Sequence, residues 1–119
     1  MIRLLGVTGL LLSLTCANPG PRYNVAVKNL TSTPLADAYV SFGEFRSLGR
    51  PLPPGGHARQ GRVPFPIPER AAVTWRTSDG VSHTVEVDVK PIVPKNFTGD
   101  IFFDIHDGEQ IVVRVEPTG

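Results

Sequence analysis

Three histidines and one cysteine are the residues of this chain whose chemistry is most versatile. His57, His83 and His106 are widely separated, and no His-x-His, His-x-x-x-His or Cys-x-x-Cys spacing occurs. Such spacings bring two ligands to one metal ion, so the sequence predicts no metal site and no cofactor. His83, His106 and Asp107 each lie near a predicted hairpin tip. They would meet if both tips lie at the same end of the fold.

No motif in this sequence points to a catalytic nucleophile. No Gly-x-Ser-x-Gly turn occurs, and Gly55-Gly56 is too short for a phosphate-binding loop. Asp79 and Asp107 each precede a glycine, which explains both as turn residues. We therefore predict no catalytic residue and no enzymatic activity. The alternative is a small periplasmic hydrolase or metal-dependent enzyme that uses histidines at one end of the fold.

The elements that must position these side chains are predicted to be β-strands. Apolar and polar residues alternate through residues 71–77 and again through residues 81–89. A period of two with one apolar face is typical of a half-buried antiparallel strand. The glycine between the two runs, Gly80, marks the turn of a β-hairpin.

The length of this turn decides the pairing of the strands. A two-residue turn would oppose Val73 to Glu86 and place a carboxylate in the core. A three-residue loop, with Gly80 in the left-handed conformation, opposes Val73 to Val85 instead. We predict the second register, whose apolar pairs are Trp75–His83, Val73–Val85 and Ala71–Val87.

A second hairpin is predicted near the end of the sequence. Residues 101–105 and 111–115 alternate in the same way, and the loop of residues 106–108 again has glycine at its third position. The same turn rule fixes the register. The predicted pairs are Ile105–Glu109, Phe103–Ile111, Ile101–Val113 and, on the surface, Asp100–Arg114.

Three further segments complete the predicted fold. Residues 23–29 and 36–42 alternate and should form strands. Residues 63–68 alternate proline with large apolar residues, which indicates an edge strand or a polyproline-II segment on the sheet. With about seven strands and no helical pattern, the sequence predicts an all-β fold. We expect an antiparallel β-sandwich with an immunoglobulin-like or transthyretin-like outline.

Two longer connections remain between these strands. Residues 90–99 link the hairpins, and we expect Ile92, Val93 and Phe97 to pack under a corner. Residues 46–61 form the longest irregular segment, which is either a crossover between sheets or a functional loop. This loop carries several basic groups and no acidic one, so it could attract an acidic partner. The candidate binding residues are Arg46, Arg50, His57 and Arg59.

The N-terminal residues predict where the protein is sent. Arg3 precedes an apolar run at residues 4–14, which has the length of a secretory core segment rather than a membrane span. Ser13-Leu14-Thr15 and then Cys16, the sole cysteine, follow. This stretch resembles a bacterial lipoprotein signal, which implies cleavage before Cys16 and lipidation of its thiol. Ordinary cleavage after Ala17 is the alternative.

These observations predict one exported domain. Residues 1–16 are the signal and lipobox, residues 17–22 a tether, and residues 23–117 the β-sandwich. The net charge of +1 leaves no basic stripe for nucleic acid, and a lone cysteine forms no internal disulfide. We expect a lipid-anchored envelope protein, facing the periplasm or the cell surface, that binds a protein or envelope component. Soluble periplasmic or secreted location, and an inhibitor or immunity-like role, are the alternatives.

Overall fold

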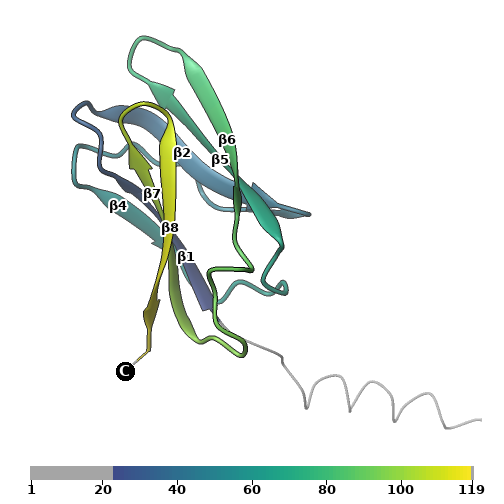
Figure 1. Ribbon diagram of the computed structural model, residues 1–119. Helices are drawn as coiled ribbons and strands as arrows, with labels where there is room; N and C mark the ends of the chain where they lie inside the picture. Colours follow the sequence, from purple (N-terminus) through teal and green to yellow (C-terminus); the bar gives the residue numbers. More distant parts are fainter. Residues whose placement is uncertain (1–22, 119) are drawn as a thin grey trace, which may run out of the picture.

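The computed structural model describes residues 23–118, which fold into eight β-strands without a helix (Figure 1). No helix in this part of the chain could therefore cross a membrane. The signal, the lipobox with Cys16, and the tether lie outside the described residues. The strands are β1 (Tyr23–Asn29), β2 (Leu35–Phe42), β3 (Phe45–Arg46), β4 (His57–Gln60), β5 (Arg70–Thr77), β6 (Ser82–Asp88), β7 (Gly99–His106) and β8 (Gln110–Pro117).

The strands form two four-stranded sheets that pack face to face. Sheet A has the order β4-β1-β7-β8, and sheet B has the order β3-β2-β5-β6. The all-β sandwich expected from the sequence is therefore confirmed. One pairing departs from the antiparallel expectation, because β1 runs parallel to β7 with Tyr23 opposite Gly99.

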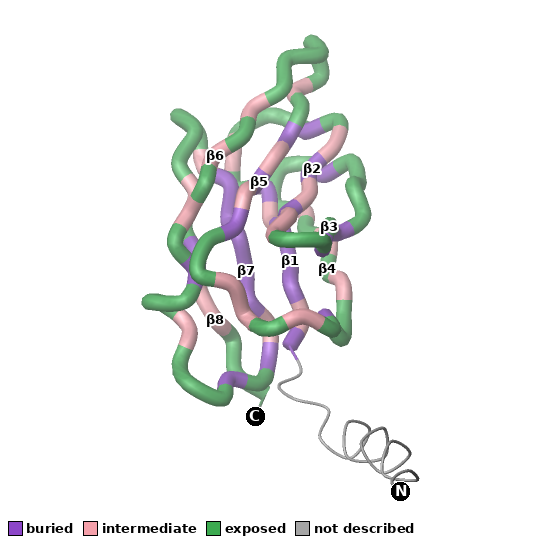
Figure 2. The backbone as a smooth tube through the Cα atoms, turned by 90° about the vertical axis from the view of Figure 1, so that its right-hand side faces the viewer, coloured by how far each residue is buried: buried purple, intermediate pink, exposed green. Residues whose placement is uncertain are grey.

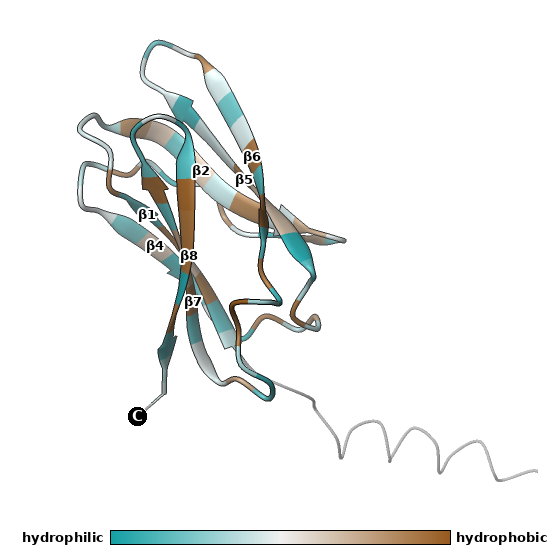
Figure 3. Ribbon diagram, in the orientation of Figure 1, coloured by the Kyte–Doolittle hydropathy of each residue, from teal (hydrophilic) through white to brown (hydrophobic). Residues whose placement is uncertain are grey.

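The core lies between the two sheets and consists of the apolar side chains on the inner faces of their strands. Val40 and Val73 of sheet B and Ile105 of sheet A are fully buried, and Phe103 is 1% exposed. Trp75 is 4% exposed, as its place on the apolar face of β5 predicts. Figure 2 shows this burial along the inner strands, whereas the turns are exposed. The apolar residues are also visible as brown bands on the strands in Figure 3.

The hairpin of β5 and β6 has the predicted register. Trp75 lies opposite His83 and Val73 lies opposite Val85. The amide of Thr77 donates to the carbonyl of Val81 across the loop of residues 78–80. Gly80 adopts a φ of +89°, which is the left-handed conformation that this turn needs.

The hairpin of β7 and β8 differs from the predicted register by two residues. Ile105 pairs with Ile111 rather than Glu109, and the same shift moves every later pair. The loop is Asp107-Gly108-Glu109, in which Gly108 has φ +80° and Glu109 has φ +58°. Leaving Glu109 in the turn keeps its carboxylate off the apolar face. Phe103 consequently pairs with Val113, Ile101 with Val115, and Asp100 with Glu116.

Strand β2 contains a bulge that the sequence pattern did not reveal. Its pairing with β5 shifts between Leu35 and Asp37. Leu35 therefore points into the core and is 2% exposed, whereas Ala36, expected on the apolar face, is exposed. The extra residue lets the larger side chain take the inner position.

The segment of residues 46–61 is a crossover from sheet B to sheet A, and it is less irregular than expected. It begins at the end of β3, continues through Leu52, which bridges to Leu35, and ends in β4. The buried Asn29 holds its middle, because its side-chain amide donates to the carbonyl of Leu52 at 3.0 Å. Asn29 also exchanges backbone hydrogen bonds with Gly55 and Gly56.

Residues 63–68 do not form the expected edge strand. Only the amide of Val63 donates to a neighbouring strand, namely to the carbonyl of Tyr23. Pro64, Pro66 and Pro68 have no amide donor, and the amides of Phe65 and Ile67 donate to no backbone carbonyl, so no ladder forms. Phe65 and Ile67 still pack against the core, as expected. The Tyr23 hydroxyl donates to the carbonyl of Phe65 at 2.8 Å, and burial raises the pKa of Tyr23 to about 12.

The connection before β7 packs only in part. Phe97 is 5% exposed and Val93 packs on the core, as expected. Ile92 was expected to pack beside them but is 45% exposed. The backbone turns after Val89, with the amides of Ile92 and Val93 donating to its carbonyl, and this turn carries Ile92 outward.

Candidate functional site

The four basic residues singled out in the sequence lie in different parts of the molecule. Arg46 ends β3, and its guanidinium carbon is 3.9 Å from the centre of the Tyr39 ring. Arg50 is exposed in the crossover. His57 and Arg59 belong to β4 at the edge of sheet A.

The register shows that these residues do not share one surface. Arg46 lies opposite Ser41 and alternates with the buried Phe45, so it is on the outer face of sheet B. Arg59 lies opposite Ala26, which alternates with the core residues Val25 and Val27, so it is on the outer face of sheet A. The outer faces of a sandwich point in opposite directions. Binding through these residues stays a prediction, but they cannot form a single patch.

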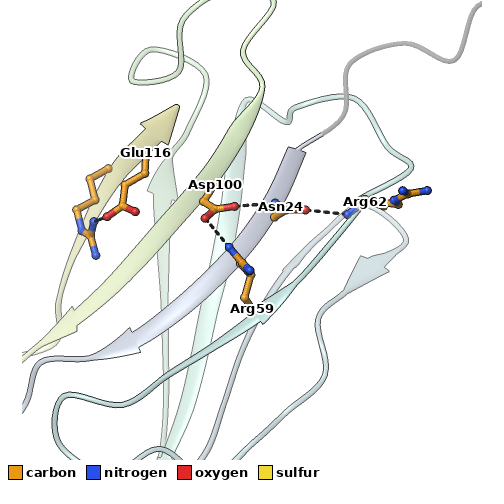
Figure 4. A network of polar contacts seen from close by, with 6 residues as sticks. Asn24, Arg59, Arg62, Asp100 and Glu116 are labelled. Atoms are coloured by element: carbon orange, nitrogen blue, oxygen red, sulfur yellow. Dashed lines mark hydrogen bonds and ion pairs between the residues drawn. The ribbon is translucent and has the colours of Figure 1, made fainter. Parts of the chain in front are cut away.

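Arg59 is already held by an acidic partner within the fold. Its guanidinium lies 2.9 Å from the carboxylate of Asp100, which also accepts a hydrogen bond from Asn24 at 2.6 Å (Figure 4). Burial opposes ionisation of Asp100, but these hydrogen bonds outweigh it and lower the pKa of the carboxyl below its ordinary value. The contacts join β4, β1 and β7, so Arg59 has a clear structural role.

A hollow lies where the two Asp-Gly hairpins meet, and we call it the tip-end hollow. Its volume is about 300 Å³, and both sheets line it together with the connection between β1 and β2. Its lining residues are Thr31, Thr33, Leu35, Trp75, Thr77, His83, His106, Asp107, Gly108 and Glu109.

The histidines and carboxylates of the two tips gather at this hollow. The His83 ring stacks on Trp75 with ring centres 5.3 Å apart and planes at 14°. Its Nδ1 lies 2.9 Å from a carboxylate oxygen of Glu109, and this contact joins the two sheets. His106 and Asp107 line the same hollow, so the meeting suggested by the sequence does occur. Within residues 23–118, however, no group of three ligating side chains has the geometry to hold a metal ion.

This hollow offers hydrogen-bonding groups beside apolar surface of similar extent. Threonine hydroxyls, imidazoles and carboxylates supply both donors and acceptors. The Trp75 ring is 4% exposed and stacked on His83, so it has no free face for a ligand. The arrangement therefore suits a polar group of a partner that is held by several hydrogen bonds.

Glu109 and Thr33 are among the contributors to this hollow that the sequence did not predict. Glu109 was placed in a strand, whereas the structure places it in the turn beside His83. The signal was available, because the predicted register opposed Glu109 to Ile105 on an apolar face. Thr33 gave no local signal, because it reaches the hollow only when β1 and β2 join different sheets.

The fold and this site define an all-β sandwich with a polar hollow at one end. In fold, the chain is similar to a protein from Eubacterium rectale whose structure was solved by NMR, with a TM-score of 0.55 and 13% identity. The similarity covers 82% of this chain and 90% of that one. At such low identity the likeness shows the fold alone. No protein-family model matches the chain, and no curated protein matches it in sequence.

Proposed function

We propose that this chain is an exported bacterial protein, anchored to a membrane of the cell envelope through a lipid on Cys16, that acts as a non-enzymatic binding module. Its partner is another protein or envelope component, and the tip-end hollow is its binding site. Arg46 and Arg50, on other parts of the surface, are secondary candidates for contact with an acidic partner.

The observation that supports this proposal is the placement of the hollow relative to the N-terminus of the domain. Strand β1 starts at Tyr23, and only six residues separate it from Cys16. Strand β7 runs parallel to β1 from Gly99, beside Tyr23, to His106 at the hollow. The hollow therefore lies at the far end of the sandwich. A domain anchored at Cys16 would present it away from the membrane.

The anchor is tested by mass spectrometry of the intact protein from fractionated membranes. We expect a chain that begins at Cys16 and carries acyl groups. The Cys16→Ser variant should leave the membrane fraction. A mature chain that begins after Ala17, recovered from the soluble fraction, would show that the anchor is absent.

The binding site is tested by site-specific photo-crosslinking in the native cell. A crosslinking residue at Thr33, in the hollow, should capture a defined partner. The same residue at Glu86, exposed on the outer face of sheet B, is the control. His83→Ala should reduce capture from Thr33. Equal capture from both positions would rule out the hollow as the site.

One observation favours a second candidate function, a small hydrolase. The close contact of His83 with Glu109 resembles the pairing of a base with the group that orients it. Screening the purified chain against ester and phosphate substrates, with His83→Ala and Glu109→Gln beside it, tests this alternative. Turnover that survives both variants would exclude these residues.

A further inference from the structure

A second hollow lies at the opposite end of the sandwich, where β1 begins, and we call it the entry-end hollow. Its volume is about 450 Å³. It forms mainly from the connection before β7, which Figure 1 shows at the same end as the start of β1. Its lining residues are Ile67, Lys90, Val93, Pro94, Lys95, Asn96 and Phe97.

The surface around this hollow combines apolar and basic groups. Ile92, beside the hollow in sequence, is 45% exposed, and Pro91 and Pro94 are exposed as well. Lys95 forms no ion pair with any residue between 23 and 118, whereas Lys90 lies 3.3 Å from Glu69. The segment of residues 90–98 contains no acidic residue.

Arg62 adds a further positive charge at this end. It is exposed, and its backbone amide donates to the side chain of Asn24 near the start of β1 (Figure 4). The described residues offer its guanidinium no carboxylate within ion-pair distance. Exposed apolar residues flanked by cations are the pattern that favours the interface of a bilayer with anionic lipids.

We propose that this end of the domain is a membrane-contacting surface, which binds a bilayer containing anionic phospholipid through Lys95, Arg62 and Ile92. The proposal rests on the proposed lipid anchor for its place in the cell. The tether of six residues can span only about 20 Å, so anchoring would keep the start of β1 close to the headgroups. Short tethers create effective concentrations in the millimolar range, at which a weak surface contact is occupied.

This contact would also orient the domain. Tyr23 and Gly99 are neighbours at the entry end, and the tip-end hollow lies at the other end of the same strands. Binding of the entry end to the bilayer would hold the tip-end hollow outward. The anchor fixes how far the entry end lies from the bilayer, and this contact would in addition fix the tilt of the domain.

The test uses NMR on the chain from Cys16 to Gly119, with the thiol capped so that no anchor contributes. Nanodiscs of phosphatidylcholine with phosphatidylglycerol, doped with a gadolinium lipid, should broaden the amide signals of residues 90–98. Nanodiscs of phosphatidylcholine alone should broaden them far less. Signals from the hairpin tips should stay sharp in both.

Paired variants separate this surface from general effects of charge and apolarity. Lys95→Glu should weaken binding to the anionic discs roughly thirtyfold, because the change spans two charges. Arg76→Glu makes the same change of charge near the tip of the β5–β6 hairpin, at the other end of the domain, and should have little effect. Ile92→Ser should weaken binding. Val81→Ser should not, because Val81 is 48% exposed at the tip of the β5–β6 hairpin, at the other end of the domain.

Three results would overturn the proposal. These are broadening that is equal at both ends, broadening that does not depend on anionic lipid, and line widths that follow protein concentration without discs. The last result would show that the surface binds a second copy of the chain. Since no acyl group takes part, failure here leaves the proposed anchor standing. An unmodified Cys16 in the cell would refute the anchor but would not change the lipid binding that the nanodiscs measure.

Discussion

The two hairpins of this protein share an Asp-Gly turn but differ in how the turn is built. In β5–β6 the loop is Ser78-Asp79-Gly80, and only the glycine has a positive φ. In β7–β8 the loop is Asp107-Gly108-Glu109, so the glycine is its second residue rather than its third. Both Gly108 and Glu109 have positive φ. The same dipeptide therefore supports two registers.

The side chains that follow the glycine explain this difference. Val81 and Ser82 can begin a strand after Gly80 without placing a charge on the inner face. Starting β8 at Glu109 would oppose a carboxylate to the buried Ile105. The free-energy cost of burying an unpaired carboxylate exceeds the roughly 1–2 kcal/mol that a non-glycine residue costs in the left-handed conformation. The second hairpin consequently accepts backbone strain to keep its core apolar.

The largest expected effect comes from truncating the core residue of each hairpin. Trp75→Ala and Phe103→Ala should each lower the free energy of unfolding by about 3–5 kcal/mol, because both side chains are buried between the sheets. Urea unfolding measures both losses. A near-silent Trp75→Ala beside a damaging Phe103→Ala would show that the β5–β6 hairpin contributes little to the core.

The second-largest effect is expected from breaking the ion pair of Arg114 with Asp104, which the β7–β8 register brings together. Arg114 lies over the Phe102 ring and its Nε is 2.5 Å from Asp104, whose side chain is 5% exposed. Arg114→Ala should cost about 2–3 kcal/mol, less than for a fully buried pair, because Arg114 is 34% exposed.

A matched control and a rescue accompany this measurement. Arg76→Ala, on the exposed face of β5, should change stability by less than about 0.5 kcal/mol. Adding Asp104→Asn to Arg114→Ala should recover part of the loss, because no charge then remains buried. Equal effects of the two arginine variants would contradict a special role for the Asp104 contact.

A smaller effect distinguishes the two registers of β7–β8 directly. Glu109→Gly and Glu109→Gln both alter the contact with His83, but only glycine relieves the positive φ. We expect Glu109→Gly to be more stable than Glu109→Gln by up to about 1 kcal/mol. The register predicted from sequence places Glu109 in a strand, where glycine would be the less stable of the two. Thermal melts of both variants show which of the two is more stable.

The smallest effect concerns acid and the β5–β6 turn. A hydrogen bond from the Thr77 hydroxyl, and another from the amide of Val81, hold the pKa of Asp79 below its ordinary value. A lowered pKa stabilises the turn above the ordinary pKa of the carboxyl, and this contribution is lost as pH falls through the folded pKa. The Val81 amide signal should shift on acidification by NMR. The shift should be absent in Asp79→Asn.

Local pattern predicted those parts of the fold in which neighbouring residues decide. Alternation located the four strands of the hairpins, and the β5–β6 register followed from the position of Glu86. The same test of faces, applied to Glu109, would have corrected the β7–β8 register. Short strands such as β3 and β4 escaped detection because two to four residues carry no readable period.

The candidate site could be predicted only in part. The proximity of His83 to His106 depended on both hairpin tips facing one end, which the sequence could suggest but not require. The basic residues of the crossover looked like one cluster because they are close in sequence. A crossover joins two sheets, so Arg46 and Arg59 were carried to opposite faces.

The sequence by itself determined an all-β chain, the inner and outer residues of the first hairpin, and the turn of that hairpin, because each depends on residues a few positions apart. Tertiary structure decided the parallel pairing of β1 with β7, the bulge at Ala36 and the two hollows at the ends of the sandwich. These features join segments as distant as Tyr23 and Gly99. Which distant strands pair depends on how all the apolar faces are buried together, and no local pattern records that choice.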